Sequence, residues 1–159
     1  MRDRDQTLLM GSGDLKIQWT APTRDTAKLN SDASFLPDSG QCWGGVVARD
    51  HKGQVYLSVA RKLATATCAH EAEGKAMLMG LHELAARYNG HVLVETDCKV
   101  LADDLKEGAQ NRSACYGLIM DIRAALANFA SYQVKHTARE RNSLHTNLQQ
   151  KLGEQETSP

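Results

Sequence analysis

The sequence predicts a single α/β domain built on a mixed β-sheet. Three short runs with the period of two that is typical of strands come first, within residues 28–61, and a long helix-like segment follows them. After that helix, the continuous apolar run Val92-Leu93-Val94 indicates a strand that is covered on both faces. Strand-like runs on both sides of a helix are typical of a sheet packed against helices, so the order of the elements predicts the fold class.

The first three strands are expected to form an antiparallel meander. The first strand is predicted at 28–35, where apolar and polar residues alternate. The second and third, at 42–49 and 54–61, flank the segment Asp50-His51-Lys52-Gly53, whose glycine suits a positive φ. We therefore expect a hairpin between the second and third strands, with the first strand beside it.

The second half of the chain alternates helices with two further strands. A helix is predicted over 69–88, because Asn89-Gly90 supplies a residue suited to the left-handed cap that ends a helix. The remaining elements are expected at 91–96 (strand), 99–107 and 116–129 (helices), 132–137 (strand) and 142–152 (helix). Residues 1–25 are expected to be a partly flexible lead-in, 26–152 the folded domain, and 153–159 a disordered tail.

Composition places this chain among ordinary soluble proteins. Its 159 residues include 19 Lys and Arg against 19 Asp and Glu, so no global charge draws it to nucleic acid or membrane. No apolar run is long enough to cross a bilayer, and the N-terminus lacks the apolar region of a secretory signal. The four cysteines are scattered without a C-x-x-C pair, which argues against zinc and favours reduced, mostly structural thiols. We expect an intracellular protein, nuclear or cytoplasmic.

Two acids open the long helix, and only one of them is predicted to face the sheet. Glu71 and Glu73 are about 200° apart around the helix axis. Glu73 shares its face with small and apolar residues, whereas Glu71 lies on the polar face at ion-pair spacing from Lys75. We expect Glu71 to be a solvated acid. Glu73 is either a functional acid or a partly buried one that a nearby donor satisfies.

Two further acids occupy unusual positions near strands. Asp32 lies within the first strand, where Asp is disfavoured; the alternative to a functional role is an edge strand whose polar face meets water. Asp97 follows the buried fourth strand, a position that suits either a ligand crevice or a cap of the next helix. Glu95, on the same face of that strand, is a weaker candidate. Three acids on separate elements suggest a convergent metal site.

Several short segments, each weak alone, together resemble ribonuclease H. The likeness is greater to the plant ribonuclease H-like domain, which is reverse-transcriptase-associated and retroelement-derived. It runs from Trp19 to about Leu152. The matching segments are Trp19 and Pro22, then 28–34 (KLNSDAS), 44–53 (GGVVARDHKG), 71–73 (EAE) ahead of Gly80-Leu81, 94–98 (VETDC), 111–113 (NRS), 121–123 (DIR) and 139–142 (RERN).

This resemblance implies a ribonuclease H-like fold and a metal-dependent nuclease. The fold is a five-stranded mixed sheet with helices on both faces, in the order βββαβααβα. The implied activity is hydrolysis of the RNA strand of RNA–DNA hybrids with Mg²⁺ or Mn²⁺. Asp32, Glu73 and Asp97 match the three carboxylates that hold metal in that family.

The family's fourth metal ligand, an Asp, is matched by Thr146 in this chain. A hydroxyl is a poorer ligand for magnesium than a carboxylate, so the site is expected to be weakened. His145 stands next to this position, and His136 is a further accessory candidate near the mouth of the site.

The same resemblance implies contacts to the hybrid substrate. The expected substrate-binding residues are Asn30, Ser34, Asn111, Arg139 and Asn142. The neutral net charge argues against tight binding of a hybrid by this domain alone, so we expect help from a neighbouring domain of a larger multidomain protein. The alternative reading is a catalytically inactive ribonuclease H-like module that binds nucleic acid or protein.

Overall fold

The computed structural model describes residues 19–107 and 114–138. The strands are β1 (Thr26–Phe35), β2 (Cys42–Arg49), β3 (Val55–Lys62), β4 (His91–Thr96) and β5 (Ser131–His136), and the helices are α1 (Ala69–Ala85), α2 (Lys99–Glu107) and α3 (Tyr116–Leu126).

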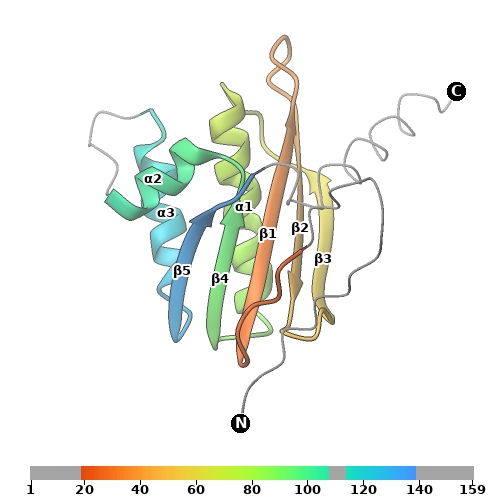
Figure 1. Ribbon diagram of the computed structural model, residues 1–159. Coiled ribbons are helices and arrows are strands. Elements are labelled where there is room, and N and C mark those ends of the chain that lie inside the picture. The colour runs from red at the N-terminus through yellow and green to blue at the C-terminus, as the bar shows by residue number, and fades with distance from the viewer. Residues whose placement is uncertain (1–18, 108–113, 139–159) are drawn as a thin grey trace, which may run out of the picture.

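The five strands form one mixed sheet in the order β3-β2-β1-β4-β5 (Figure 1). The pairs β1–β2 and β2–β3 are antiparallel, whereas β1–β4 and β4–β5 are parallel. The β2–β3 turn is closed by Asp50, whose carboxylate accepts hydrogen bonds from the N–H groups of Lys52 and Gln54 at 2.8 and 2.9 Å. Gly53 has the positive φ, 80°, that this turn requires. The predicted meander and mixed sheet are confirmed.

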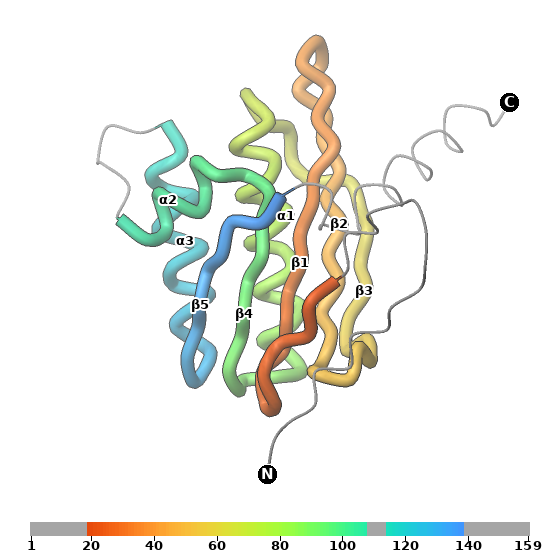
Figure 2. The backbone as a smooth tube through the Cα atoms, viewed as in Figure 1, coloured from red at the N-terminus to blue at the C-terminus, as the bar shows by residue number. Residues whose placement is uncertain are grey.

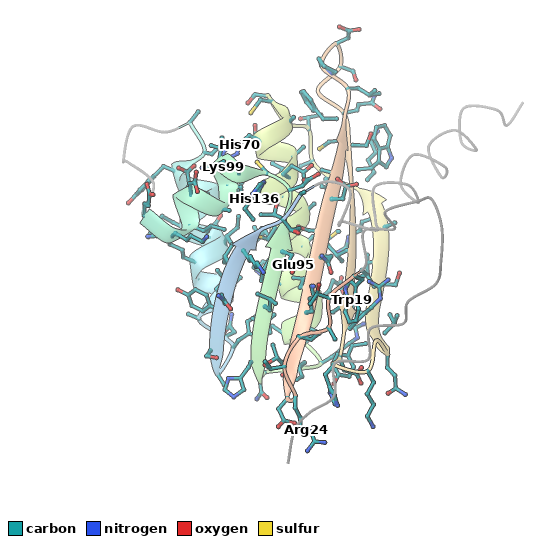
Figure 3. The ribbon with its side chains drawn as sticks, in the orientation of Figure 1. Trp19, Arg24, His70, Glu95, Lys99 and His136 are labelled. Atoms are coloured by element: carbon teal, nitrogen blue, oxygen red, sulfur yellow. The ribbon has the colours of Figure 1, made fainter. Side chains whose placement is uncertain are left out.

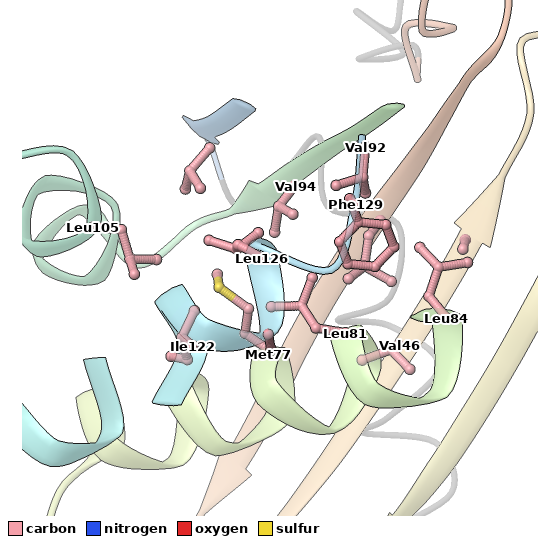
Figure 4. Packing of buried hydrophobic residues seen from close by; sticks show 14 of the residues in the cluster. Val46, Met77, Leu81, Leu84, Val92, Val94, Leu105, Ile122, Leu126 and Phe129 are labelled. Carbon is pink, nitrogen blue, oxygen red and sulfur yellow. The ribbon is translucent and has the colours of Figure 1, made fainter. Parts of the chain in front are cut away.

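Helices α1 and α3 cover one face of the sheet, and α2 lies beside them near the upper ends of β4 and β5 (Figure 1). Helix α1 approaches the sheet closely at Gly80, where an added Cβ would lie 2.7 Å from Cγ1 of Val46. The core between these layers is apolar and almost free of solvent (Figure 4). Its largest fully buried apolar side chains are Leu29, Met77, Leu81, Leu84, Leu101, Ile119, Ile122 and Leu126.

Helix α2 has the predicted bounds, whereas α1 and α3 end earlier than the sequence predicts. Helix α1 ends at Ala85 rather than 88, and α3 ends at Leu126 rather than 129. Beyond α1 the hydroxyl of Tyr88 donates toward the carbonyls of Asp25 and His91, at 3.0 and 2.9 Å. This side chain joins the turn to the starts of β1 and β4, and those contacts replace a further helical turn.

Several predicted segments lie outside the described residues. These are the helix at 142–152, the tail at 153–159 and residues 1–18 of the lead-in. The expectation of helices on both faces involves the helix at 142–152 and stays a prediction. Within 19–107 and 114–138, no helix has the length and apolar character needed to span a membrane.

Residues 19–25 form the described part of the lead-in and run beside the polar face of the sheet (Figure 2). The ring of Trp19 lies under two cations, with Lys28 Nζ 5.1 Å and Arg49 Cζ 5.8 Å from its centroid. This segment is therefore tied to β1 and β2 by side-chain contacts.

Candidate metal centre

Three carboxylates from three elements meet at the upper end of the sheet. Asp32 comes from β1, Glu73 from α1, and Asp97 from the residue that follows β4. One carboxylate oxygen from each lies within 4.8 Å of the other two. Asp32 is 1% exposed and Glu73 7% exposed, while Asp97 is half-buried. The chain therefore concentrates three acids in a space of limited water access.

The site forms where β1 and β4 part. Their parallel register ends at the pair Asn30 and Glu95, and β1 continues beyond it, paired with β2. Past that point the N–H of Ala33 donates to Oε1 of Glu73 at 3.2 Å. The carboxylate of a helix behind the sheet thus reaches the backbone of the strand that carries Asp32. The end of β4 leaves the space that Asp97 and Glu73 share.

Glu71, the other acid of the first turn of α1, has a structural role. Its Oε2 accepts hydrogen bonds from the N–H and hydroxyl of Thr67 at 2.8 and 2.7 Å. Its Oε1 pairs with Lys75 at 2.8 Å, as the sequence spacing predicts. The pKa of Glu71 is lowered to about 2, mainly by the contact with Lys75 and then by the bonds from Thr67. Glu71 therefore ties the first turn of α1 to Thr67, and of these two acids only Glu73 joins the cluster.

The charge of the cluster acts on the neighbouring thiol of Cys98. Burial raises the pKa of this thiol, and the negative charges of Glu73 and Asp97 raise it further. A set of carboxylate oxygens in a buried, negatively charged place suits a hard divalent cation such as Mg²⁺ or Mn²⁺. The residues present therefore fit the metal that the sequence led us to expect.

His70 borders the cluster, and sequence reasoning did not single it out. Its Nδ1 lies 3.5 Å from Sγ of Cys98, and its Nε2 lies 3.6 Å from Oδ2 of Asp104 in α2. Figure 3 shows His70 near Lys99, at the end of the sheet where α2 begins. The available signal was its spacing: His70 precedes Glu73 by three residues and so lies one helical turn away. It links the first turn of α1 to the segment that carries Asp97.

Asn30 and Glu95 form a separate buried group with Lys28. Lys28 Nζ pairs with Oε1 of Glu95 at 2.8 Å and donates to the carbonyl of Thr20 at 2.6 Å. The amide of Asn30 donates to Oε2 of Glu95 at 3.1 Å, and Asn30 is 1% exposed. In this structure Asn30, expected to bind substrate, is tied to Glu95 and turned away from solvent.

A groove of about 310 Å³ lies beside this ion pair, between residues 19–23 and the strands β4 and β5. Lys28 and Glu95 line it, but none of the three clustered carboxylates does. The charges of Lys28 and Glu95 already neutralise each other in this groove. The candidate for metal binding is therefore the acid cluster and not the groove.

Beside Asp32, the polar face of the sheet presents Ser34, Trp43 and Lys62 in one row across three strands. Gly44 and Val46 of β2 pack against α1, so the alternating residue Trp43 faces the opposite side. Ser34 and Trp43 are half-buried, Lys62 is exposed, and its ammonium lies 5.6 Å from the Trp43 ring centroid.

The remaining residues predicted for the site are His136 on β5 and five residues outside the described part of the chain. His136 is exposed at the end of β5 and is paired in register with Thr96. Thr146, His145, Asn111, Arg139 and Asn142 lie outside the described residues, so their roles stay predictions.

Comparison with known proteins identifies a family and a fold. Residues 30–150 match the family model described as reverse transcriptase-like. No curated protein sequence matches this chain.

Several solved structures share the fold at low sequence identity. RNase H1 from the halophilic archaeon Halobacterium salinarum NRC-1 is 17% identical, with a TM-score of 0.72 over 81% of this chain and 98% of its own. The N-terminal RNase H domain of a Mycobacterium tuberculosis protein is 16% identical, with a TM-score of 0.72 over 84% of this chain and 99% of its own. LC11-RNase H1 in complex with an RNA/DNA hybrid is 17% identical, with a TM-score of 0.67 over 77% and 92% of the two chains.

Proposed function

The chain belongs to the reverse transcriptase-like family and has the ribonuclease H fold, and from this premise we propose that it is a metal-dependent endonuclease that hydrolyses the RNA strand of RNA–DNA hybrids. The observation that carries the proposal is the convergence of Asp32, Glu73 and Asp97 within 4.8 Å. One related structure contains an RNA/DNA hybrid, which supports the substrate class.

Asp32, Glu73 and Asp97 would hold Mg²⁺ or Mn²⁺. The chemistry supplied by such a cation is Lewis acidity, which offsets charge on phosphodiester oxygens and makes water more acidic. The chain's own groups prepare the place for it. The N–H of Ala33 orients the Glu73 carboxylate, and burial of Asp32 limits competition from bulk water. These features pre-organise the acids before substrate arrives.

The polar face beside Asp32 supplies the proposed path for the substrate. Lys62 offers a positive charge for a phosphate, and Ser34 offers a hydroxyl next to the acid cluster. Gly45, the register partner of Asp32, has no side chain to obstruct this face. Recognition of an RNA–DNA hybrid relies on backbone phosphates and 2′-hydroxyl groups, for which such polar residues are suited. Further domains of a larger protein would add affinity that a neutral chain lacks.

The direct test is cleavage of a hybrid whose RNA and DNA strands carry different labels. We expect wild-type protein with Mg²⁺ or Mn²⁺ to cut the RNA strand, and Asp32→Asn to abolish cutting. Glu71→Gln is the matched control, because it removes an acid from the same helical turn that lies outside the cluster. If the wild type and Asp32→Asn give the same trace, the proposed nuclease activity is wrong.

A second candidate function is favoured by Thr146, which stands where the family places a fourth acid. If the three carboxylates bind metal too weakly for catalysis, the domain would be an inactive module that binds nucleic acid. That candidate predicts hybrid binding without cleavage, and a melting temperature that millimolar Mg²⁺ leaves unchanged, since only a ligand that binds the native state stabilises it.

A further inference from the structure

Trp43 of β2 stands next to the acid cluster on the polar face of the sheet. Asp32 of β1 is the register partner of Gly45, and Ser34 is the register partner of Trp43. In an antiparallel pair, diagonal neighbours such as Asp32 and Trp43 lie about 7–8 Å apart, a distance that an aromatic side chain can span. Gly45 itself carries no side chain. Trp43 is therefore the side chain of β2 that borders Asp32 on the side of the β1–β2 turn.

A cation continues this row across the sheet. β1 stays paired with β2 above Asn30 and Glu95, the last pair that it forms with β4 (Figure 1). Lys62 of β3 is the register partner of Trp43, and its ammonium lies 5.6 Å from the centroid of the indole ring. Neighbouring strands are about 4.8 Å apart, so β3 lies about 10 Å across the sheet from β1. The row thus runs from the acid cluster through an indole ring to an ammonium.

The same order of groups suits one strand of a nucleic acid. A cation at the acid cluster takes a phosphate, an indole ring takes a base by stacking, and an ammonium takes another phosphate. Trp43 is half-buried and Lys62 is exposed, so the ring is partly held by the sheet and the charge meets solvent. A base inside a duplex is already stacked on its neighbours, and freeing it costs energy. The row therefore suits a nucleotide whose base is unpaired.

We propose that Trp43 stacks on an unpaired base of the RNA strand, next to the phosphate at the acid cluster, while Lys62 binds the following phosphate. The domain then prefers RNA–DNA hybrids with a single-stranded RNA flank over fully paired hybrids. This inference rests on the proposed function, because it takes the acid cluster as the place of the scissile phosphate. Trp43 acts here as a specificity-determining residue.

The first test follows the fluorescence of Trp43. The chain has two tryptophans, so Trp19→Phe leaves Trp43 as the one indole and keeps a ring beside Lys28 and Arg49. Asp32→Asn is added to prevent cleavage, and Mg²⁺ is present. The ligands are a blunt RNA–DNA hybrid and the same hybrid with its RNA strand extended by a few unpaired nucleotides. We expect the extended hybrid to quench the fluorescence and to bind more tightly than the blunt one.

The second test measures affinity for both hybrids by the anisotropy of a labelled strand, in the Asp32→Asn parent protein. Trp43→Ala should weaken binding of the extended hybrid by roughly 5- to 100-fold, as expected for the loss of one stacked base, and leave the blunt hybrid unaffected. Trp43→Phe keeps a ring and should retain most of the preference. Lys62→Gln should weaken both hybrids alike and lower the salt dependence by about one ion. Tyr132→Ala is the matched control, because it removes an exposed ring from β5, and should bind as the parent does.

Three results would overturn the proposal. These are equal affinities of the parent protein for the two hybrids, Trp43 fluorescence that the extended hybrid leaves unchanged, and an equal loss for both hybrids in Trp43→Ala. The last is the result expected if Trp43 only packs β2 against β3. If Trp43→Ala does not fold, the quenching and the preference of the parent protein still decide.

Failure of the proposed nuclease activity is a separate result. Wild-type protein that prefers the extended hybrid through Trp43 and never cuts it would contradict the hydrolysis and leave this inference standing. Wild-type protein that cuts both hybrids equally, with Trp43→Ala unimpaired, would do the reverse.

Discussion

The backbone N–H of Ala33 donates a hydrogen bond of 3.2 Å to the carboxylate of Glu73, and so joins α1 to the strand residue that follows Asp32. This bond crosses from the helical layer to the edge of β1 that β4 leaves open. It fixes the Glu73 carboxylate, of which one oxygen lies within 4.8 Å of an oxygen of Asp32 and of Asp97. The position of Glu73 is therefore set by the backbone of β1 as well as by α1.

Substitution of Glu73 should weaken metal binding far more than substitution of Glu71. Glu73→Gln removes a proposed ligand while the amide oxygen can keep the bond from Ala33. We expect Mg²⁺ or Mn²⁺ affinity to fall by more than the roughly 10–100-fold that loss of a supporting contact costs. Glu71→Gln should leave the affinity near that of the wild type. Isothermal titration calorimetry at neutral pH measures both, and equal losses would contradict the assignment.

Glu71 should make stability depend on acid pH. Its pKa is lowered to about 2 in the folded protein from an ordinary value of 4.5, so the unfolded chain binds more protons between these values. The stabilisation is complete above about pH 4.5 and is lost as pH falls toward 2. Denaturant unfolding from pH 6 to 2.5 should show a shallower pH dependence for Glu71→Gln than for the wild type. Identical slopes would show that the contacts of Glu71 with Thr67 and Lys75 do not persist in solution.

The buried ion pair between Lys28 and Glu95 should be costly to break from one side. Its members are 2% and 7% exposed, so Lys28→Met leaves a buried carboxylate without its cation. We expect a loss of about 3–5 kcal/mol in the free energy of unfolding. The double variant Lys28→Met/Glu95→Leu should recover much of that loss, because two apolar groups need no charge partner. Asp103→Asn, in the exposed pair with Lys99, is the control and should cost at most about 1 kcal/mol. Additive losses in the double variant would rule out this coupling.

Gly80 should tolerate no side chain. A Cβ there would lie 2.7 Å from Cγ1 of Val46 across the interface between α1 and β2. We expect Gly80→Ala to destabilise the fold by about 1–3 kcal/mol in chemical denaturation. Gly117→Ala is the matched helical control, since nothing lies within 4 Å of its Cβ, and it should be neutral or stabilising. A stable Gly80→Ala protein would indicate that the helix shifts easily on the sheet.

Position 146 offers a gain-of-function test of the proposed site. If Thr146 faces the acid cluster, Thr146→Asp adds the carboxylate that the family resemblance leads one to expect. Metal affinity or the rate of hybrid cleavage should then rise, and the rise should vanish when Asp32→Asn is added. An unchanged affinity and rate would place Thr146 away from the cluster.

Much of the fold follows from local patterns. The alternation in 28–35, the turn at Asp50-His51-Lys52-Gly53 and the apolar run at Val92-Leu93-Val94 each predicted an element that the structure contains. The ends of α1 and α3 were placed too late, because contacts such as those of Tyr88 with distant backbone carbonyls compete with the last helical turn. Such contacts join residues far apart in sequence and leave no periodic signal.

By itself the sequence determined the order of the elements, the fold class and the helical face that distinguishes Glu73 from Glu71. Those properties depend on spacing along one strand or one helix, which local geometry sets. Only the tertiary structure decided that Asp32, Glu73 and Asp97 lie within 4.8 Å and that Asn30 is engaged by Glu95. Both depend on how β1 and β4 lie beside each other and on where they part, and such distances arise when the layers come together.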